Sequence, residues 1–215
     1  MTVLKKLTGF IGAEIEGLTL SETISGADAD FLKKSLAEHQ VLVLRGQFLT
    51  PPQQKALTRV FGPAMQLPYV APLEDDPETI AVLKEASEAG GGVFGGEWHA
   101  DFSFLENPPA GSVLNAVEIP DVGGDTVWAS QVVAYQSLPA ALKSVVDGRN
   151  AVHVGKPYGV KHAPPSETRA NASIRMTRGD PEADREIFHP AVITEPITGA
   201  KALFLNPIYT TRFDG

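Results

Sequence analysis

The stretch that decides the fold is WHADFSFLENPPAGSVLNAVEIPDVGGDTVWAS, from Trp98 to Ser130. Its first motif, Trp98-His99-Ala100-Asp101, places an imidazole and a carboxylate two positions apart. In a β-strand, side chains two positions apart point to the same face, so His99 and Asp101 would converge on one point. That pair of ligands suits Fe(II), which can be held on one face by two histidines and a carboxylate. We therefore predict a metal centre with His99 and Asp101 as ligands and a further histidine from elsewhere.

A His-x-Asp pair alone is a weak signal, because so short a motif occurs often by chance. The pair gains context from Gly123-Gly124-Asp125-Thr126, which follows at a distance that allows a neighbouring strand. The two glycines favour a tight turn that enters a strand, where Thr126 would offer a hydroxyl group. Taken by itself, Thr126 is better interpreted as an ordinary side chain on a sheet surface.

Length and composition restrict the class of protein. The 215 residues suffice for one domain with a sizeable core. Hydrophobic residues make up 43% of the chain and charged residues 20%, which is ordinary for a soluble globular protein. The formal net charge is −8 and no cluster of Lys and Arg occurs, which argues against a nucleic-acid partner. An anionic substrate would need a local arginine to overcome this overall field.

The chain contains no cysteine, which excludes disulfides, thiolate metal sites and cysteine nucleophiles. This composition fits a reducing cytoplasm, which is the expected location. The sequence has no apolar run of bilayer length and no signal-peptide core after Lys5 and Lys6. We therefore expect neither a membrane partner nor secretion.

The remaining pattern predicts many short strands and a few helices. Strands are expected at 10–18, 41–44, 112–119, 125–129 and 151–154, with a hairpin over 190–205. Helices are expected at 27–39, from Pro51 to about Val60 after an N-cap at Thr50, and over 132–146 with a break at Leu138-Pro139. This set favours an α+β, mainly β protein built around a β-sandwich or jelly roll. The segments 85–96 and 156–186 are expected to be a mobile loop and a flexible lid.

Together, three segments resemble the TauD/TfdA family of Fe(II)- and 2-oxoglutarate-dependent dioxygenases, and the similarity covers nearly the whole chain. They are HQVLVLRGQFLTPPQQKALTRVFG (His39 to Gly62), the stretch from Trp98 to Ser130, and HPAVITEPITGAKALFLNPIYTTRF (His189 to Phe213). The resemblance implies a double-stranded β-helix, or jelly roll, with flanking helices as a single domain over 1–215.

The same resemblance implies the chemistry of the site. His99 and Asp101 would bind Fe(II), and Thr126 would hydrogen-bond a carboxylate of the co-substrate 2-oxoglutarate. With O2 as the other co-substrate, the enzyme would hydroxylate a small organic molecule and release succinate and CO2.

The chain departs from the family pattern at its end. Family members are longer, and the segment that carries their second iron histidine and the arginine for 2-oxoglutarate is absent before Gly215. The chain is therefore expected to be C-terminally incomplete. His153, His162 and His189 remain as substitutes for the third ligand. We expect His153 to be packed or to line a pocket and His162 to be exposed, and His189 precedes the hairpin rather than occupying the ligand position.

Four positions bear on the substrate. Leu67, Val70 and Gly95 stand where taurine-specific members have a histidine, a tyrosine and an asparagine, and Tyr209 aligns with a pocket aromatic or packs in the core. Without those polar partners, the charges of taurine would be poorly paired. We therefore expect another sulfonate, a sulfate ester or a carboxylate as substrate.

Two alternatives come from other classes of protein. The chain could be a non-catalytic jelly-roll binding protein that has lost the complete iron site, which the absent histidine supports. It could also be a hydrolase that uses another divalent metal at His99 and Asp101. In all three hypotheses the protein binds a small molecule. None of them decides whether the protein forms a homo-oligomer.

Overall fold

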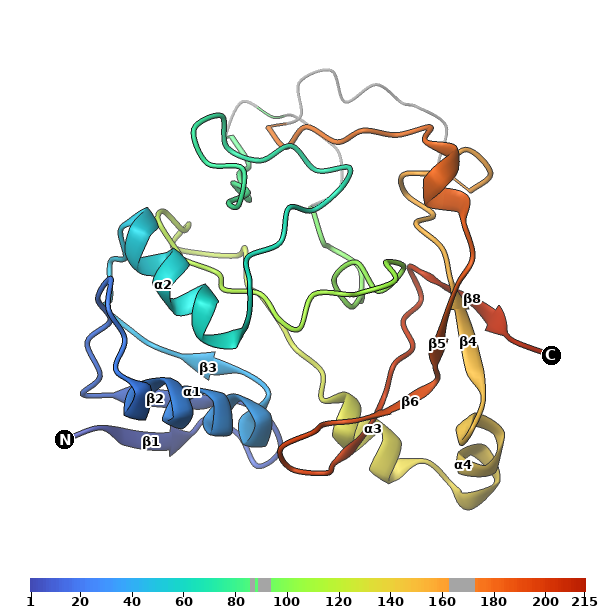
Figure 1. Cartoon of the computed structure of the whole chain (residues 1–215), viewed down its shortest axis with the longest axis horizontal. Helices are drawn as coiled ribbons and strands as arrows, with labels where there is room; N and C mark the ends of the chain where they lie inside the picture. Colours follow the sequence, from blue (N-terminus) through green and yellow to red (C-terminus); the bar gives the residue numbers. More distant parts are fainter. Residues whose placement is uncertain (86–87, 89–93, 163–172) are drawn as a thin grey trace. The chain divides into compact units, whose positions relative to one another are not determined.

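A computed structural model describes residues 1–85, 88, 94–162 and 173–215. The chain divides into two compact units: unit 1 comprises Met1–Ala64, Ala110–Asp147 and Val192–Leu203, and unit 2 comprises Met65–Pro109, Gly148–Ala191 and Phe204–Gly215. The described residues contain eight strands, four α-helices and one 3-10 helix (Figure 1). The predicted mixed α+β composition is confirmed.

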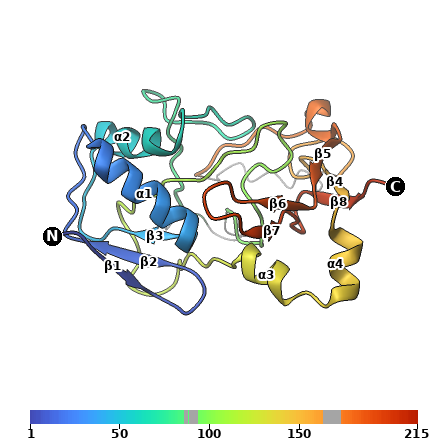
Figure 2. The ribbon, with the colours of Figure 1, turned by 60° about the horizontal axis from the view of Figure 1, so that its bottom comes forward.

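Unit 1 contains a three-stranded sheet in the order β1-β2-β3. Strand β1 (Val3–Lys6) runs antiparallel to β2 (Ala13–Glu16), and β2 runs parallel to β3 (Leu42–Val43). A parallel pair needs a long crossover, which helix α1 (Gly26–His39) provides between β2 and β3. Figure 2 shows α1 beside these strands. The strand predicted at 10–18 is thus shorter than expected, and the one at 41–44 is confirmed.

Helices α1 and α2 (Pro51–Phe61) begin where the sequence predicts. The Ser25 hydroxyl accepts a hydrogen bond from the Asp28 amide at 3.1 Å, which caps α1. Pro51 is the first residue of α2, and the Gln53 side chain accepts from the Thr50 amide at 2.8 Å. The two helices share one buried core with the sheet, formed by Ile15, Leu18, Leu20, Leu32 and Leu57.

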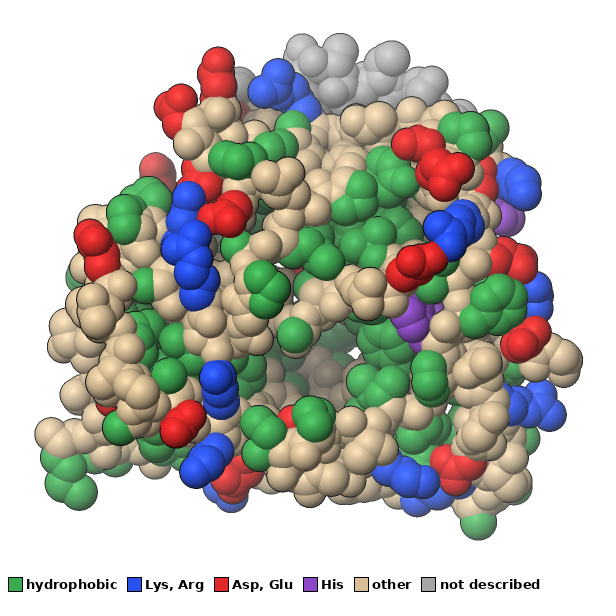
Figure 3. Space-filling model, viewed as in Figure 1, with side chains coloured by type: hydrophobic (Ala, Val, Ile, Leu, Met, Phe, Trp, Pro, Cys, Tyr) green, Lys and Arg blue, Asp and Glu red, His purple; other side chains and the backbone are tan. Residues whose placement is uncertain are grey.

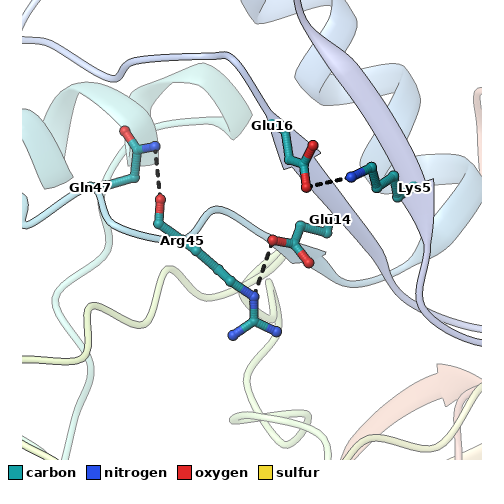
Figure 4. Close-up of polar contacts among 5 residues, drawn as sticks. All are labelled: Lys5, Glu14, Glu16, Arg45 and Gln47. Carbon is teal, nitrogen blue, oxygen red and sulfur yellow. Dashed lines mark hydrogen bonds and ion pairs between the residues drawn. The ribbon is translucent and has the colours of Figure 1, made fainter.

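Polar contacts connect the sheet of unit 1 to the loop after β3 (Figure 4). Lys5 pairs with Glu16 at 2.7 Å across β1 and β2, and Arg45 pairs with Glu14 at 3.1 Å. The Gln47 amide donates to the Arg45 carbonyl at 3.4 Å. Because Lys5, Glu16 and Arg45 are largely exposed, these pairs fix the register more than they add stability.

The later helices of unit 1 and its hairpin follow the predicted order. Helices α3 (Gln131–Ser137) and α4 (Ala140–Val146) are separated at Leu138-Pro139, as expected. Strands β6 (Val192–Thr194) and β7 (Lys201–Leu203) form the predicted antiparallel hairpin, and α3 packs against β7. Figure 2 shows this hairpin and α3 next to each other.

The strands predicted at 112–119 and 125–129 are wrong. Both segments are described, yet neither forms a ladder with another described residue, and Val117 and Val127 are 91% and 65% exposed. Two side chains supply bonds here in place of a neighbouring strand. Gln54 donates to the Val113 carbonyl, and Asn115 donates to the Leu49 carbonyl, each at 3.2 Å. A segment with an alternating pattern forms a strand only where a second strand can pair with its backbone N–H and C=O groups.

Unit 2 is built on a second three-stranded sheet in the order β5-β4-β8. Strand β4 (Asn150–His153) lies between β5 (Ile187–Pro190) and β8 (Thr210–Phe213) and is antiparallel to both. Its pairing with β8 shifts register between Val152 and His153. The apolar residues of β4 are fully buried, as its central place requires, and the strand predicted at 151–154 is confirmed.

The segment predicted to be a lid is packed at both described ends. Tyr158 and Ala183 are buried, and Asp184, in the 3-10 helix η1 (Pro181–Asp184), accepts from the Val160 and Lys161 amides at 2.8 and 3.0 Å. Its middle, 163–172, and most of the loop predicted at 85–96 lie outside the described residues. The lid function stays a prediction.

Two surface properties bear on the partners. Across the ranges that the structure describes, no helix combines the length and the apolar composition needed to cross a bilayer. On the face drawn in Figure 3, basic and acidic side chains are interspersed.

Candidate metal centre

His99 and Asp101 of unit 2 converge, although neither lies in the expected strand: His99 is in irregular backbone and Asp101 begins a turn. The distance from His99 Nε2 to Asp101 Oδ1 is 3.0 Å. The next residue, Phe102, has a φ of 47°, a left-handed conformation that a strand does not contain. The convergence of the two side chains therefore does not come from strand alternation.

The contact of His99 Nδ1 decides which ring nitrogen carries the hydrogen. Nδ1 lies 2.7 Å from the Glu97 carbonyl oxygen, which can only accept, so Nδ1 carries a hydrogen. In the neutral ring the lone pair of Nε2 then faces a carboxylate oxygen, and two acceptors at 3.0 Å repel unless a proton or a cation lies between them. The hydrogen bond to Asp101 raises the pKa of His99, because the carboxylate favours the imidazolium, while burial opposes this rise.

The same pair of atoms fits a divalent metal. Metal–ligand bonds of about 2.1 Å at right angles place two neighbouring ligand atoms about 3 Å apart. The observed separation of 3.0 Å matches that spacing. The Glu97 carbonyl also holds the His99 ring in the tautomer that a metal at Nε2 requires.

Gly95 lies against the His99 ring. It has a φ of 67°, and a Cβ atom at this position would stand 3.2 Å from His99 Cε1. Gly95 thus lies next to the predicted metal ligand, and its predicted contact with the substrate stays a prediction.

An apolar cluster lies beside the Asp101 segment. Its buried members are Val70, Phe102, Phe104, Tyr158, Ile174, Ala183 and Tyr209, and Leu67 and Tyr69 pack against it. The rings of Phe104 and Tyr209 are 4.8 Å apart, and those of Phe102 and Tyr158 are stacked at 6.0 Å. The structure thus brings Leu67, Val70 and Tyr209, three of the predicted substrate residues, into one cluster.

Two phenols add polar groups to this cluster. Burial raises the pKa of Tyr209, and the neighbouring Tyr158 hydroxyl and the Asp101 carboxylate raise it further. Burial also raises the pKa of Tyr158. Both phenols are therefore neutral hydrogen-bonding groups near Asp101 at physiological pH.

The other predicted residues lie apart from this pair. His189 Nε2 donates to the Leu105 carbonyl at 2.8 Å, His153 is fully buried, and His162 is exposed. No group of three His, Asp or Glu side chains within the described ranges is placed to hold a metal. Thr126 belongs to unit 1 and is exposed, so its contact with 2-oxoglutarate stays a prediction.

An open cavity of about 350 Å³ lies in unit 2. Tyr69 and Phe104 of the apolar cluster form part of its wall, and the ion pair of Glu106 with Arg185 forms another part. Neither His99 nor Asp101 lines this cavity.

Sequence reasoning missed several residues around the pair. Tyr158 is buried beside Phe102, although it begins the segment that was assigned to a flexible lid. Ser103 and Asn206 are also buried and hydrogen-bonded to each other, 103 positions apart. The aromatic side chain of Tyr158 in a polar stretch was a usable signal for burial, whereas no local pattern pairs Ser103 with Asn206.

The family described as "Taurine catabolism dioxygenase TauD, TfdA family" matches residues 4–215. The chain belongs to the TauD/TfdA family. Membership of this family implies Fe(II), 2-oxoglutarate and O2 as cofactor and co-substrates.

Two relatives in the family are named for sulfate esters. An alkylsulfatase of Acinetobacter baylyi is 35% identical over 208 residues, which are 96% of this chain and 63% of that protein. An alpha-ketoglutarate-dependent sulfate ester dioxygenase of Pseudomonas putida is 34% identical over 93% of this chain and 64% of its own length. The chain thus spans less than two thirds of the length of these curated relatives.

A solved structure supports the assignment at the level of the fold. The crystal structure of a taurine dioxygenase from Burkholderia xenovorans superposes with a TM-score of 0.73 at 28% sequence identity. The match covers 100% of this chain and 66% of that one.

Proposed function

We propose that this chain carries two of the iron ligands of a 2-oxoglutarate-dependent dioxygenase, and that these ligands are His99 and Asp101. The observation that carries the proposal is the convergence of His99 Nε2 and Asp101 Oδ1 to 3.0 Å in a chain of this family. We further propose that the fold of the whole protein is the jelly roll, and that 1–215 belong to one domain. The family match across both units supports this reading.

Each residue at the centre has a distinct task. When bound, Fe(II) would supply hydroxylation of the substrate by O2, coupled to decarboxylation of 2-oxoglutarate to succinate and CO2. His99 would offer the Nε2 lone pair and release a proton to solvent as the cation binds. The Glu97 carbonyl keeps the other ring proton on Nδ1, and Asp101 supplies negative charge.

The proposed substrate is the sulfate ester of an apolar alcohol. Support comes from the apolar cluster that contains Leu67, Val70 and Tyr209, and from the names of two relatives. The apolar side chains would cover the alcohol portion, and the neutral phenols of Tyr158 and Tyr209 could donate hydrogen bonds to sulfate oxygens. Taurine would leave its ammonium group without a partner among the buried residues of this cluster.

Metal binding tests the proposal directly. We would titrate Mn(II), as a redox-stable substitute for Fe(II), into the wild-type chain with 2-oxoglutarate and follow free Mn(II) by electron paramagnetic resonance. We expect the wild type to bind, and His99→Ala and Asp101→Ala to lose at least tenfold in affinity. His162→Ala serves as the matched control, because it removes an exposed histidine elsewhere in unit 2.

A second candidate, the non-catalytic binding protein, rests on one observation. No third His, Asp or Glu joins His99 and Asp101 within the described ranges. This candidate expects no Mn(II) binding and no succinate release, even for the protein encoded by the full reading frame. Equal Mn(II) affinity in wild type and His99→Ala would reject the proposed centre.

A further inference from the structure

A chain of buried hydrogen bonds connects the Asp101 segment to the sheet of unit 2. Ser103 follows Asp101 by two positions, His153 ends β4, and Asn206 precedes β8. Ser103 and His153 are 0% exposed and Asn206 is 8% exposed. The Ser103 hydroxyl oxygen lies 2.9 Å from Asn206 Nδ2 and 3.0 Å from His153 Nδ1.

A backbone amide determines the direction of the hydrogen bond between Asn206 and Ser103. The Tyr209 N–H donates to Asn206 Oδ1 at 2.9 Å, which fixes the orientation of the amide group. Asn206 Nδ2 must therefore donate to the Ser103 oxygen, and the Ser103 hydroxyl can donate to His153 Nδ1 when that nitrogen carries no hydrogen. His153 is then a neutral ring whose hydrogen is on Nε2.

The surroundings of His153 agree with a neutral acceptor. Burial lowers the pKa of His153 to about 4, and the nearby His189 lowers it further, although the Phe204 backbone opposes the shift. The ring of Phe204 stacks on His153 at 5.4 Å, and His189 meets it edge-on at 5.5 Å. A protonated ring could not accept the Ser103 hydrogen, so the neutral form is the one that completes the chain of bonds.

We call the hydrogen-bonded group of Ser103, His153 and Asn206 the anchor. Its first member, Ser103, lies two positions after Asp101. The Asp101 side chain is 46% exposed, whereas Ser103 points into the protein and Phe102 and Phe104 are buried on either side of it. The left-handed Phe102 reverses the chain between Asp101 and Ser103. Asp101 is thus held at the start of a segment that is fixed by the two buried hydrogen bonds of Ser103 and by two buried rings.

We propose that Ser103, His153 and Asn206 are positioning residues that hold Asp101 at the distance from His99 that a divalent metal requires. This inference rests on the proposed function, because it assigns the anchor a role in metal affinity. It also assigns His153 a role other than ligand. Loss of outer contacts that orient metal ligands typically costs about 10- to 100-fold in affinity.

Ser103→Ala is the primary test. We expect its Mn(II) affinity, measured with 2-oxoglutarate, to fall about tenfold or more below that of the wild type. Ser144→Ala removes an exposed hydroxyl that bonds only a helix carbonyl, and should leave the affinity unchanged. Thermal unfolding of each variant shows that the comparison is made between folded proteins.

Two substitutions of His153 separate positioning from packing. In His153→Asn, the side-chain oxygen takes the place of Nδ1 and can accept the Ser103 hydrogen, so affinity should stay within about threefold of the wild type. His153→Leu fills the space without an acceptor and should lose as much affinity as Ser103→Ala. Nitrogen-15 shifts of the wild-type ring should show the neutral form with hydrogen on Nε2 at pH 7.

The outcomes distinguish the two proposals. If folded Ser103→Ala keeps the Mn(II) affinity of the wild type, or if both His153 variants lose affinity equally, the positioning role of Ser103, His153 and Asn206 is overturned. The proposed metal centre is still tested separately by His99→Ala. A His153 ring with hydrogen on Nδ1 overturns the positioning role as well. Should Ser103→Ala fail to fold, the two His153 variants decide. A wild-type chain that binds no Mn(II) overturns the proposed function and the anchor with it.

Discussion

At the scale of single residues, the protonation of His99 reports on the charge of Asp101. Because the hydrogen bond to Asp101 raises the pKa of His99, the metal-free chain should titrate His99 above 6.5. Asp101→Asn should lower this pKa, as measured by nuclear magnetic resonance, and Asp30→Asn, an exposed substitution in unit 1, should not. A proton and a metal compete for Nε2, so Mn(II) affinity should fall as the pH is lowered through this pKa. A His99 pKa that is unchanged in Asp101→Asn would contradict the pairing.

Gly95 allows a controlled test of the space behind His99. Gly95→Ala places a methyl group 3.2 Å from His99 Cε1 at a φ of 67°. Gly46→Ala has nearly the same backbone angle, 66°, with nothing within 4 Å of its new methyl group. Both should lose about 1 to 2 kcal/mol of stability in chemical denaturation, because left-handed backbone disfavours a side chain. Only Gly95→Ala should also weaken Mn(II) binding, by several-fold; equal metal affinity in both would show that the ring moves aside freely.

The sequence identified the two residues that meet but not what holds them. His99 and Asp101 could be singled out because both belong to one short motif, Trp98-His99-Ala100-Asp101. Ser103, His153 and Asn206 are ordinary polar residues, and only the packing of β4 and β8 brings them together. A residue that works through a partner about fifty or a hundred positions away leaves no local trace.

At the scale of elements, the helices were predicted well because their ends are decided locally. Ser25 caps α1, and Pro51 opens α2 next to Thr50, so a few neighbouring residues specify each boundary. The segments 112–119 and 125–129 failed for the opposite reason. Their alternation is suited to a strand, but a strand forms only against a partner, and the described residues supply none.

Strand β4 should make unit 2 sensitive to acid through His153. Its pKa is about 4 in the folded chain against an ordinary value of 6.5, so the unfolded state binds a proton first as the pH falls. Stability is then complete above about pH 6.5 and is lost progressively down to pH 4, by roughly 3 kcal/mol. Urea unfolding across this range measures the loss.

The matched variant for acid sensitivity is His153→Asn, which cannot titrate in this range. Its stability should change less between pH 6.5 and pH 4 than that of the wild type, by about the same 3 kcal/mol. If both proteins lose stability in parallel, the acid sensitivity comes from other groups.

At the scale of the whole molecule, composition excluded more than it identified. The absence of cysteine excluded thiol chemistry, and the family was recognised from segments spread along the chain. The charge of −8 argues against a nucleic-acid partner, which stays a prediction. A cytoplasmic location, the oligomeric state and the C-terminal extent stay predictions. The relative placement of residues such as Thr126 and His99 depends on tertiary structure, which no segment of sequence specifies alone.

The net charge of the chain predicts how salt should change the binding of the proposed substrate. The expected effect is opposite to the effect of salt on metal binding. A sulfate ester is an anion and approaches a chain of charge −8, so repulsion should weaken its capture at low salt. Raising NaCl from about 0.01 M to about 0.15 M shortens the screening length from about 30 Å to about 8 Å. KM for the ester, measured by succinate release, should therefore fall about twofold, whereas Mn(II) affinity should weaken over the same range.

Salting-out of the alkyl group would also lower KM, and chain length separates the two effects. Screening acts on the charge alone, so short and long alkyl sulfates should show the same ratio of KM values at the two salt concentrations. Salting-out grows with the apolar area, and its ratio would rise with chain length. A KM that increases with salt for every ester would mean that a nearby cationic side chain outweighs the field of the whole protein, and that such a residue belongs to the substrate site.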